Sequence, residues 1–153
     1  MPARPLLVLD DNPEFVRTIT AIAAACGLPS IATDNPDAVA GLLAAHAPAA
    51  AIVDCLVGDR YGLAVLGVIG ATMPHLPTLV VSGYGEAFLA QAEQEGRSHG
   101  MAQVRTLAKP FSADALRAFL GEAVAAARPA SPEVLSAPLP RGQARAAPPP
   151  SAR

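Results

Sequence analysis

The sequence predicts an α/β domain built on a parallel sheet, and three observations support this. Short aliphatic runs alternate five times with segments of helical periodicity along residues 1–127. The runs are almost continuously apolar, which is typical of parallel strands buried on both faces. Hydrophobic residues make up 52% of the 153 residues and aromatic residues only 4%, so the chain can bury a core and that core must be aliphatic.

The first strand–helix unit carries clear signals for both of its parts. Pro5–Leu9 is a short apolar run followed by two acids. Asn12 then suits an N-cap and Pro13 the first helical position. The apolar positions that follow share one helical face: Phe15, Ile19, Ile22 and Cys26. Gly27 is typical of the residue that ends such a helix.

Four further units repeat the alternation. The predicted strands are Ser30–Thr33, Ala49–Val53, Thr78–Val81 and Gln103–Ala108. The predicted helices are Pro36–His46, Gly62–Ala71, Glu86–Gly100 and Ala113–Ala127. Five strand–helix units in succession predict a parallel sheet with helices on both faces. We therefore assign residues 1–127 to one domain.

Residues 128–153 differ from this domain in composition and charge. Seven of the chain's 16 prolines lie in residues 129–150, with Ala, Ser and Arg between them. Such a segment cannot bury a core, so we expect a disordered or extended tail. Residues 1–127 hold seven basic and twelve acidic residues, hence −5, and the tail holds four basic and one acidic, hence +3. An acidic domain with a sparse basic tail argues against a nucleic-acid partner.

The sequence also argues against a membrane or secreted protein. No apolar stretch approaches the roughly 18 residues that a spanning helix requires, and the N-terminus has no secretory pattern. Cys26 and Cys55 are the only cysteines. We therefore expect a cytoplasmic protein with reduced thiols.

Polar residues at the ends of four predicted strands form the candidate site. Asp10 and Asp11 follow the first strand, Asp54 the third, Ser82 the fourth and Lys109 the fifth. Ligands of open α/β sheets bind outside the carboxyl ends of the strands, so we expect these side chains to converge.

The residue types suit phosphoryl transfer to a carboxylate. Crowded carboxylates repel one another, and a hard cation such as Mg²⁺ relieves that repulsion. Asp54 can act as the nucleophile and form an acyl phosphate. Lys109 is the only lysine beside ten arginines, and its compact charge suits a small tetrahedral oxyanion. The Ser82 hydroxyl can donate a hydrogen bond to a phosphoryl oxygen.

Four segments together resemble the motifs of two-component receiver domains: Leu-Val-Leu-Asp10-Asp11-Asn-Pro, Ala-Ile-Val-Asp54, Val-Val-Ser82-Gly-Tyr-Gly and Lys109-Pro-Phe. They occur in the family's order and near its spacing, over about residues 4–127. Gly62, eight residues after Asp54, also matches.

The resemblance implies a fold and a set of residue roles. The fold is a flavodoxin-like sheet of five parallel strands, in the order 2-1-3-4-5, with five helices. Asp54 would be the phosphoacceptor. Mg²⁺ would be held by Asp11, Asp54 and the backbone carbonyl of Leu56, with Asp10 acting through water. Ser82 and Lys109 would bind the phosphoryl group.

The implied function is that of a single-domain response regulator. A histidine kinase or a histidine phosphotransfer protein would be the donor, and the chain would catalyse only its own phosphorylation and dephosphorylation. The output would be contact with an unidentified downstream protein, or the domain would act as a phosphate sink. The sequence leaves dimerisation open.

Three features depart from the usual family pattern. Gly58 replaces the proline found four residues after the acceptor, and Thr106 replaces the aromatic residue found three before the lysine. The stretch from Ser82 to Lys109 is about five residues longer than usual. Its last part resembles receivers that precede cyclic-di-GMP phosphodiesterase domains.

Of three other functions, a pseudo-receiver remains the alternative, and the residues argue against the other two. A pseudo-receiver would bind partners without phosphorylation. A haloacid-dehalogenase-type phosphatase needs a second aspartate two residues after the nucleophile, where this chain has Leu56. A nucleotide-binding flavodoxin-like protein needs a glycine-rich loop after the first strand, where this chain has Asp10 and Asp11.

Overall fold

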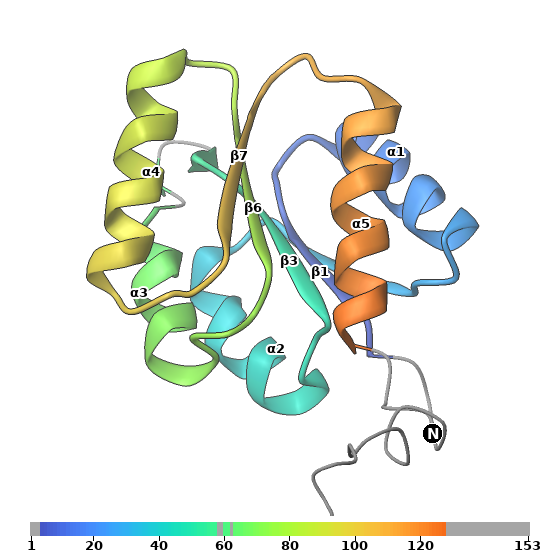
Figure 1. The fold of residues 1–153 in the computed structure, drawn as a ribbon, viewed down its shortest axis with the longest axis horizontal. Coiled ribbons are helices and arrows are strands. Elements are labelled where there is room, and N and C mark those ends of the chain that lie inside the picture. The colour runs from blue at the N-terminus through green and yellow to red at the C-terminus, as the bar shows by residue number, and fades with distance from the viewer. Residues whose placement is uncertain (1–3, 58–59, 62, 128–153) are drawn as a thin grey trace, which may run out of the picture.

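The computed structural model describes residues 4–57, 60–61 and 63–127, and a five-stranded parallel sheet forms its middle layer (Figure 1). The strands are β1 (Leu6–Leu9), β2 (Ser30–Thr33), β3 (Ala50–Asp54), β6 (Thr78–Ser82) and β7 (Val104–Ala108). Their order is β2-β1-β3-β6-β7, and each neighbouring pair is parallel. Counted along the chain, this is the predicted order 2-1-3-4-5, which is confirmed.

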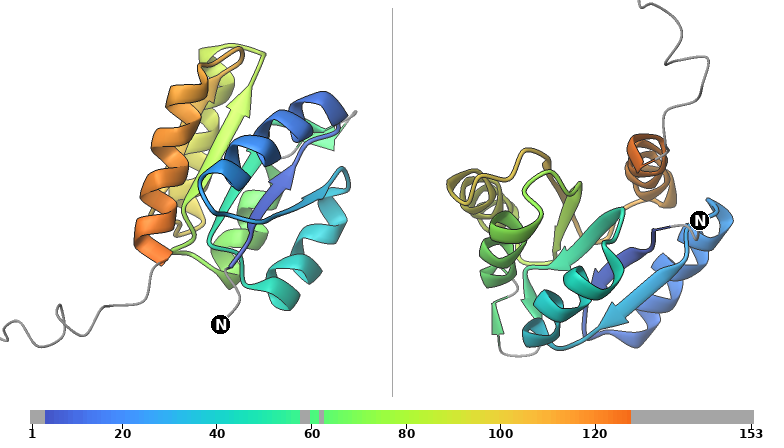
Figure 2. Two further views of the ribbon diagram at one scale, coloured as in Figure 1. Left: turned by 90° about the vertical axis from the view of Figure 1, so that its right-hand side faces the viewer. Right: turned by 90° about the horizontal axis from the view of Figure 1, so that it is seen from below.

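Within the part of the chain that the structure describes, five α-helices cover the two faces of the sheet. They are α1 (Pro13–Ala25), α2 (Val39–His46), α3 (Ala64–Thr72), α4 (Glu86–Ser98) and α5 (Ala113–Ala127). Helices α1 and α5 lie on one face, and α2, α3 and α4 lie on the other (Figures 1 and 2). Because both faces are covered, β1, β3 and β6 are buried along their whole length.

Alternation along the strands divides the core into two clusters. In β1, Leu6 and Val8 pack on the side of α1 and α5, while Leu7 and Leu9 pack on the side of α2, α3 and α4. This follows from the period of two in a strand, which points successive side chains to opposite faces. The apolar runs in the sequence are therefore continuous, since both faces require aliphatic residues.

Helix α1 begins and ends where the sequence predicts. The Asn12 side chain accepts hydrogen bonds from the backbone N–H groups of Glu14 and Phe15, and Pro13 is the first helical residue. Gly27 follows the helix with a φ of 80°, a left-handed conformation that glycine adopts without a steric penalty. The cap matters for function, because it starts the helix directly beside the end of β1.

Two local features differ from the sequence predictions. The helix predicted over residues 36–46 is divided into a 3₁₀ turn, η1 (Pro36–Ala38), followed by α2. Asn35 caps that turn through the N–H of Asp37. The sequence analysis also missed a short antiparallel pair, β4 (Leu56–Val57) with β5 (Arg60–Tyr61). The intervening dipeptide, Gly-Asp at 58–59, is typical of two-residue hairpin loops and was the available signal.

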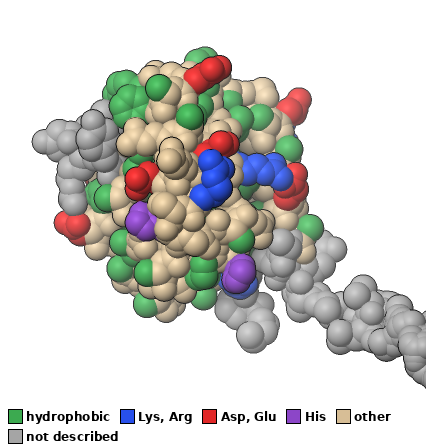
Figure 3. All heavy atoms as spheres, turned by 60° about the vertical axis from the view of Figure 1, so that its left-hand side comes forward, with side chains coloured by type: hydrophobic (Ala, Val, Ile, Leu, Met, Phe, Trp, Pro, Cys, Tyr) green, Lys and Arg blue, Asp and Glu red, His purple; other side chains and the backbone are tan. Residues whose placement is uncertain are grey.

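The remaining predictions fall partly beyond the described residues. The predicted tail at 128–153 and the predicted helix start at Gly62 lie outside them, so both stay predictions. Within 4–57, 60–61 and 63–127, no helix is long and apolar enough to cross a membrane. On the face that carries α3 and α4, the basic side chains of the described residues are scattered, some of them beside acidic ones, and do not form a continuous basic surface (Figure 3).

Candidate functional site

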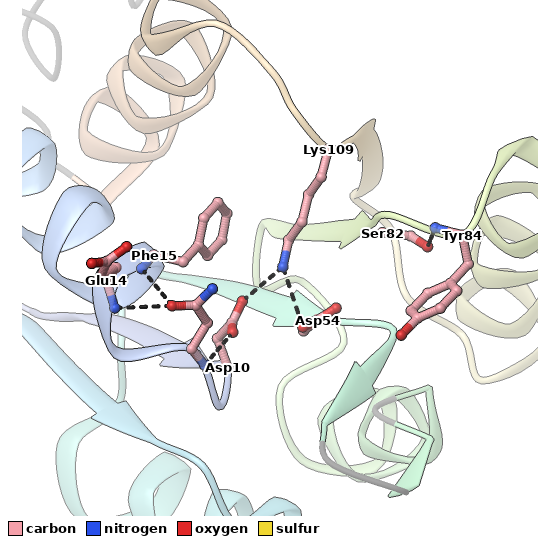
Figure 4. A network of polar contacts seen from close by, with 8 residues as sticks. Asp10, Glu14, Phe15, Asp54, Ser82, Tyr84 and Lys109 are labelled. Carbon is pink, nitrogen blue, oxygen red and sulfur yellow. Dashed lines mark hydrogen bonds and ion pairs between the residues drawn. The ribbon is translucent and has the colours of Figure 1, made fainter.

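The carboxyl ends of four neighbouring strands form the candidate site. Asp10 follows β1, Asp54 ends β3, Ser82 ends β6 and Lys109 follows β7 (Figure 4). These strands are adjacent in the sheet, so their ends lie along one edge. The structure thereby brings together side chains that are far apart in the sequence, as expected for a parallel sheet. The chemical roles of these residues stay predictions.

Lys109 links two buried carboxylates. Its Nζ donates to Oδ2 of Asp10 at 3.2 Å and to Oδ2 of Asp54 at 3.3 Å. Asp10 is 3% exposed and Asp54 is 6% exposed, whereas the Lys109 side chain is 23% exposed. A buried carboxylate without a partner is costly, so the ammonium offsets much of the penalty of placing two acids in the sheet edge.

The three aspartates form the acidic cluster of this site. Oxygen atoms of Asp10, Asp11 and Asp54 lie within 4.8 Å of one another. Asp11 is exposed, so the cluster opens to solvent on its side. Oxygen ligands of this kind are the donors that Mg²⁺ prefers, and the donor set fits that ion. Leu56 lies in β4, two residues beyond Asp54, and its backbone carbonyl stays a predicted ligand.

Backbone groups also hold Asp10 in place. The N–H of Asn12 donates to Oδ1 of Asp10 at 2.9 Å, while Lys109 occupies Oδ2. Each oxygen of this carboxylate therefore has a donor. Asn12 thus contributes twice at the end of β1, since its side chain caps α1 and its backbone orients Asp10.

Ser82 joins the ends of β6 and β7 to the loop before α4. Its side chain is completely buried, and its Oγ accepts a hydrogen bond from the N–H of Tyr84 at 3.0 Å. The N–H of Lys109 donates to the Ser82 carbonyl oxygen at 2.7 Å. Tyr84 itself is 59% exposed, and its ring packs on Phe88 at a centroid distance of 5.7 Å. A movement of the Ser82 side chain would therefore change the position of Tyr84 in the loop before α4.

Cys55 lies beside the site, directly after Asp54 in the sequence. The residue is fully buried, and its N–H donates to the Val81 carbonyl at 3.0 Å. Burial raises the pKa of the Cys55 thiol, and the negative charge of Asp54 adds to this shift. A hydrogen bond with Ser82 and the charge of Lys109 oppose it. The thiol is thus neutral at physiological pH and acts as a small apolar wall.

One residue near the ammonium was missed as a site residue in the sequence. Phe15 was assigned only to the core face of its helix, yet Nζ of Lys109 lies 4.1 Å from the centroid of its ring. The side chain is partly buried against the core on the side of α1 and α5. The sequence did offer a signal for Phe15, because it is an aromatic residue in the first turn of a helix that begins beside the candidate site.

Thr106 occupies the β7 position at which receivers usually carry an aromatic residue. Its Oγ1 donates to Oε2 of Glu93 on α4, at a long distance of 3.5 Å. The position is half-buried. A polar contact between β7 and α4 therefore lies where the receiver domains that the sequence resembles usually have an aromatic ring.

Comparison with solved structures relates this arrangement to receiver domains. No model of a known protein family matches the sequence, and no curated protein sequence does. The receiver domain of NtrX from Brucella abortus is 25% identical, with a TM-score of 0.68 over 78% of this chain and 98% of that domain. A CheY-like response regulator receiver domain protein from Methanospirillum hungatei is 15% identical, with a TM-score of 0.68 over 82% of this chain and 96% of that one.

A longer NtrX structure shows how much of a larger protein this chain matches. NtrX from Brucella abortus in complex with ADP is 24% identical, with a TM-score of 0.67. The alignment covers 82% of this chain but only 27% of that one, so the chain spans about a quarter of the larger protein's length. The chain thus has the fold of response-regulator receiver domains.

Proposed function

We propose that this chain is a receiver domain of a two-component system and accepts a phosphoryl group on Asp54. The observation that carries the proposal is the ammonium of Lys109, which bridges Asp10 and Asp54 at the carboxyl edge of the sheet. Asp11 completes an acidic cluster beside that bridge. The shared fold with receiver domains supports the same conclusion.

In the proposed reaction, a carboxylate oxygen of Asp54 attacks the phosphorus atom of a phosphohistidine donor. A phosphorus–oxygen bond forms and the phosphorus–nitrogen bond breaks, leaving its electron pair on the imidazole nitrogen, which takes up a proton from solvent. Lys109 exchanges one of its two carboxylate hydrogen bonds for a hydrogen bond to a phosphoryl oxygen, and the Ser82 hydroxyl donates a hydrogen bond to another phosphoryl oxygen. Asp11, Asp54 and the Leu56 carbonyl would hold Mg²⁺, with Asp10 acting through water, and the bound ion would supply positive charge beside the phosphoryl oxygens.

The proposed partners follow from that chemistry. A histidine kinase or a histidine phosphotransfer protein would supply the phosphoryl group in the cytoplasm, and a downstream protein would recognise the phosphorylated form. The receivers that precede cyclic-di-GMP phosphodiesterase domains remain the proposed subclass, on the strength of the long segment between Ser82 and Lys109. Helix α4, Glu86–Ser98, takes up much of that segment.

Phosphorylation by a small donor tests the proposal directly. The protein is incubated with acetyl phosphate and Mg²⁺, and its intact mass is followed with time. We expect one phosphoryl group on the wild type and none on Asp54→Asn. Asp114→Asn is the matched control, because Asp114 is an exposed acid in the first turn of α5. It should be phosphorylated like the wild type.

Two results would contradict this assignment. Phosphorylation that persists in Asp54→Asn would place the acceptor elsewhere. A wild type that takes up no phosphoryl group from acetyl phosphate or from a histidine kinase would favour the pseudo-receiver alternative.

A further inference from the structure

We propose that Phe15 is a positioning residue that holds the ammonium of Lys109 within the phosphoacceptor site. The effect on phosphorylation rests on the proposed function, whereas the contact between Phe15 and Lys109 is present in the unphosphorylated protein. Nζ of Lys109 lies 4.1 Å from the centroid of the Phe15 ring. A cation within about 6 Å of the centroid of an aromatic ring is attracted by the quadrupole of the ring, whose face has a negative electrostatic potential.

The ring completes a three-sided surrounding for the ammonium. Asp10 and Asp54 accept its hydrogen bonds, and Phe15 projects from the first turn of α1 toward the lysine side chain (Figure 4). A lysine side chain has many rotamers, and ordering it is costly. Each contact that limits those rotamers lowers the cost of bringing the charge to the reacting oxygens.

Phe15 is itself fixed from two directions. Its backbone N–H donates to the Asn12 side chain at 3.2 Å, which sets its place in the first helical turn. Its ring meets the Phe111 ring edge-on, with centroids 5.6 Å apart and an interplanar angle of 83°. Phe111 lies two residues after Lys109, so the ring joins the start of α1 to the segment that carries the lysine. A ring held in this way can act as a fixed platform.

The platform has a specific use during phosphoryl transfer. The ammonium must leave one carboxylate and reach a phosphoryl oxygen. An aromatic face attracts a cation without a directional hydrogen bond, so the ammonium can exchange acceptors while staying against the ring. Leucine would fill much of the same space but would not attract the charge. We therefore expect Phe15→Leu to slow phosphorylation by acetyl phosphate about two- to thirty-fold, the range that a lost cation–π contact predicts.

Lys109 also offers a direct structural readout. Because it is the only lysine in the chain, isotope-labelled lysine gives a single set of side-chain signals. In the unphosphorylated wild type, the ring should shift the signals of the Lys109 ε-methylene protons away from their free values. That shift should disappear in Phe15→Leu and remain in Phe15→Tyr and Phe15→Trp.

Phe119→Leu is the matched control. Phe119 is buried in the same core on α5, so this variant also exchanges a phenyl ring for an aliphatic side chain. It should leave the lysine signals and the rate of phosphorylation close to those of the wild type. If Phe15→Leu does not fold, Phe15→Met and the two aromatic variants provide the same comparison, with the aromatic pair faster than methionine.

The outcomes separate this inference from the proposed function. Unchanged lysine signals in Phe15→Leu, or a rate equal to or above that of the wild type, would overturn the inference while Asp54 remained the acceptor. A wild type without phosphorylation would overturn the proposed function, and the lysine signals would still decide whether Phe15 holds the ammonium.

Discussion

Nζ of Lys109 lies 3.3 Å from Oδ2 of Asp54, although the two residues are 55 positions apart in the sequence. The contact spans the sheet edge from the end of β7 to the end of β3, past the intervening strand β6. It places the chain's only lysine against a carboxylate that is 6% exposed. The proposed phosphoacceptor thus has a positive charge beside it before any donor binds.

Removing that charge should destabilise the protein. Lys109→Met leaves Asp10 and Asp54 buried together without their shared counter-charge. We expect the free energy of unfolding, measured with urea in the presence of a chelator, to fall by about 1–3 kcal/mol. Lys109→Arg keeps the charge and should lose less. A Lys109→Met variant as stable as the wild type would mean that the two carboxylates are satisfied by other groups.

Divalent cation should stabilise the protein through the acidic cluster. A ligand that binds only the folded state adds about 1.4 kcal/mol at ten times its dissociation constant. We expect Mg²⁺ to raise the unfolding temperature of the wild type and to have much less effect on Asp11→Asn. Asp11 is exposed, so this change should fold normally. Asp114→Asn serves again as control, and an equal response of Asp11→Asn would place the ion elsewhere.

A phosphoryl analogue should alter the region around β6 and β7. The Ser82 hydroxyl oxygen accepts a hydrogen bond from the N–H of Tyr84, and the Ser82 carbonyl oxygen accepts one from the N–H of Lys109. In the proposed site, beryllofluoride bound with Mg²⁺ accepts hydrogen bonds from the side chains of Ser82 and Lys109. We therefore expect the amide chemical shifts of residues 82–111 to change. Residues 39–46 of α2 should change little, and Asp54→Asn should not respond. Unchanged amide chemical shifts in residues 82–111 would mean that this segment does not transmit phosphorylation to a downstream protein.

The Cys55 thiol should make stability depend on pH in the alkaline range. Burial and the charge of Asp54 raise the pKa of the thiol in the folded state above its usual value of 9.0. The thiol therefore loses its proton at a lower pH in the unfolded chain than in the folded protein. Its contribution to stability is fully present below pH 9.0 and is lost as the pH rises through the pKa of the folded state. The free energy of unfolding should fall by at most about 1.4 kcal/mol per pH unit relative to Cys55→Ala. Parallel profiles for the two proteins would contradict this.

Two helical glycines should respond to alanine in opposite directions. A Cβ at Gly70 in α3 would overlap the backbone carbonyl oxygen of His99, at the end of α4. We expect Gly70→Ala to lower the free energy of unfolding by about 1–3 kcal/mol. A Cβ at Gly41 in α2 meets nothing within 4 Å, so Gly41→Ala should raise it by up to about 1 kcal/mol. Equal effects in thermal unfolding would show that α3 and α4 can separate.

Local signals account for the parts of the fold that the sequence predicted well. The Asn12 cap, Pro13 and Gly27 act within a few residues, so their effect on α1 is visible in the sequence. The divided helix at 36–46 and the β4–β5 pair were missed because both are short, and weak local preferences decide them. Thr106 shows a related limit: its residue type departs from the family pattern, but its contact with Glu93 required the packing of α4 on β7.

The sequence by itself determined the sheet, its strands and the residues at the strand ends, because apolar periodicity and strand-end chemistry are local properties. Only the tertiary structure decided how Lys109 is shared between Asp10 and Asp54, and that the Phe15 ring lies against its ammonium from the side of α1. These contacts join segments that are distant in the chain. They depend on how the first and last helices dock on one face of the sheet, and no pattern within either segment encodes that docking.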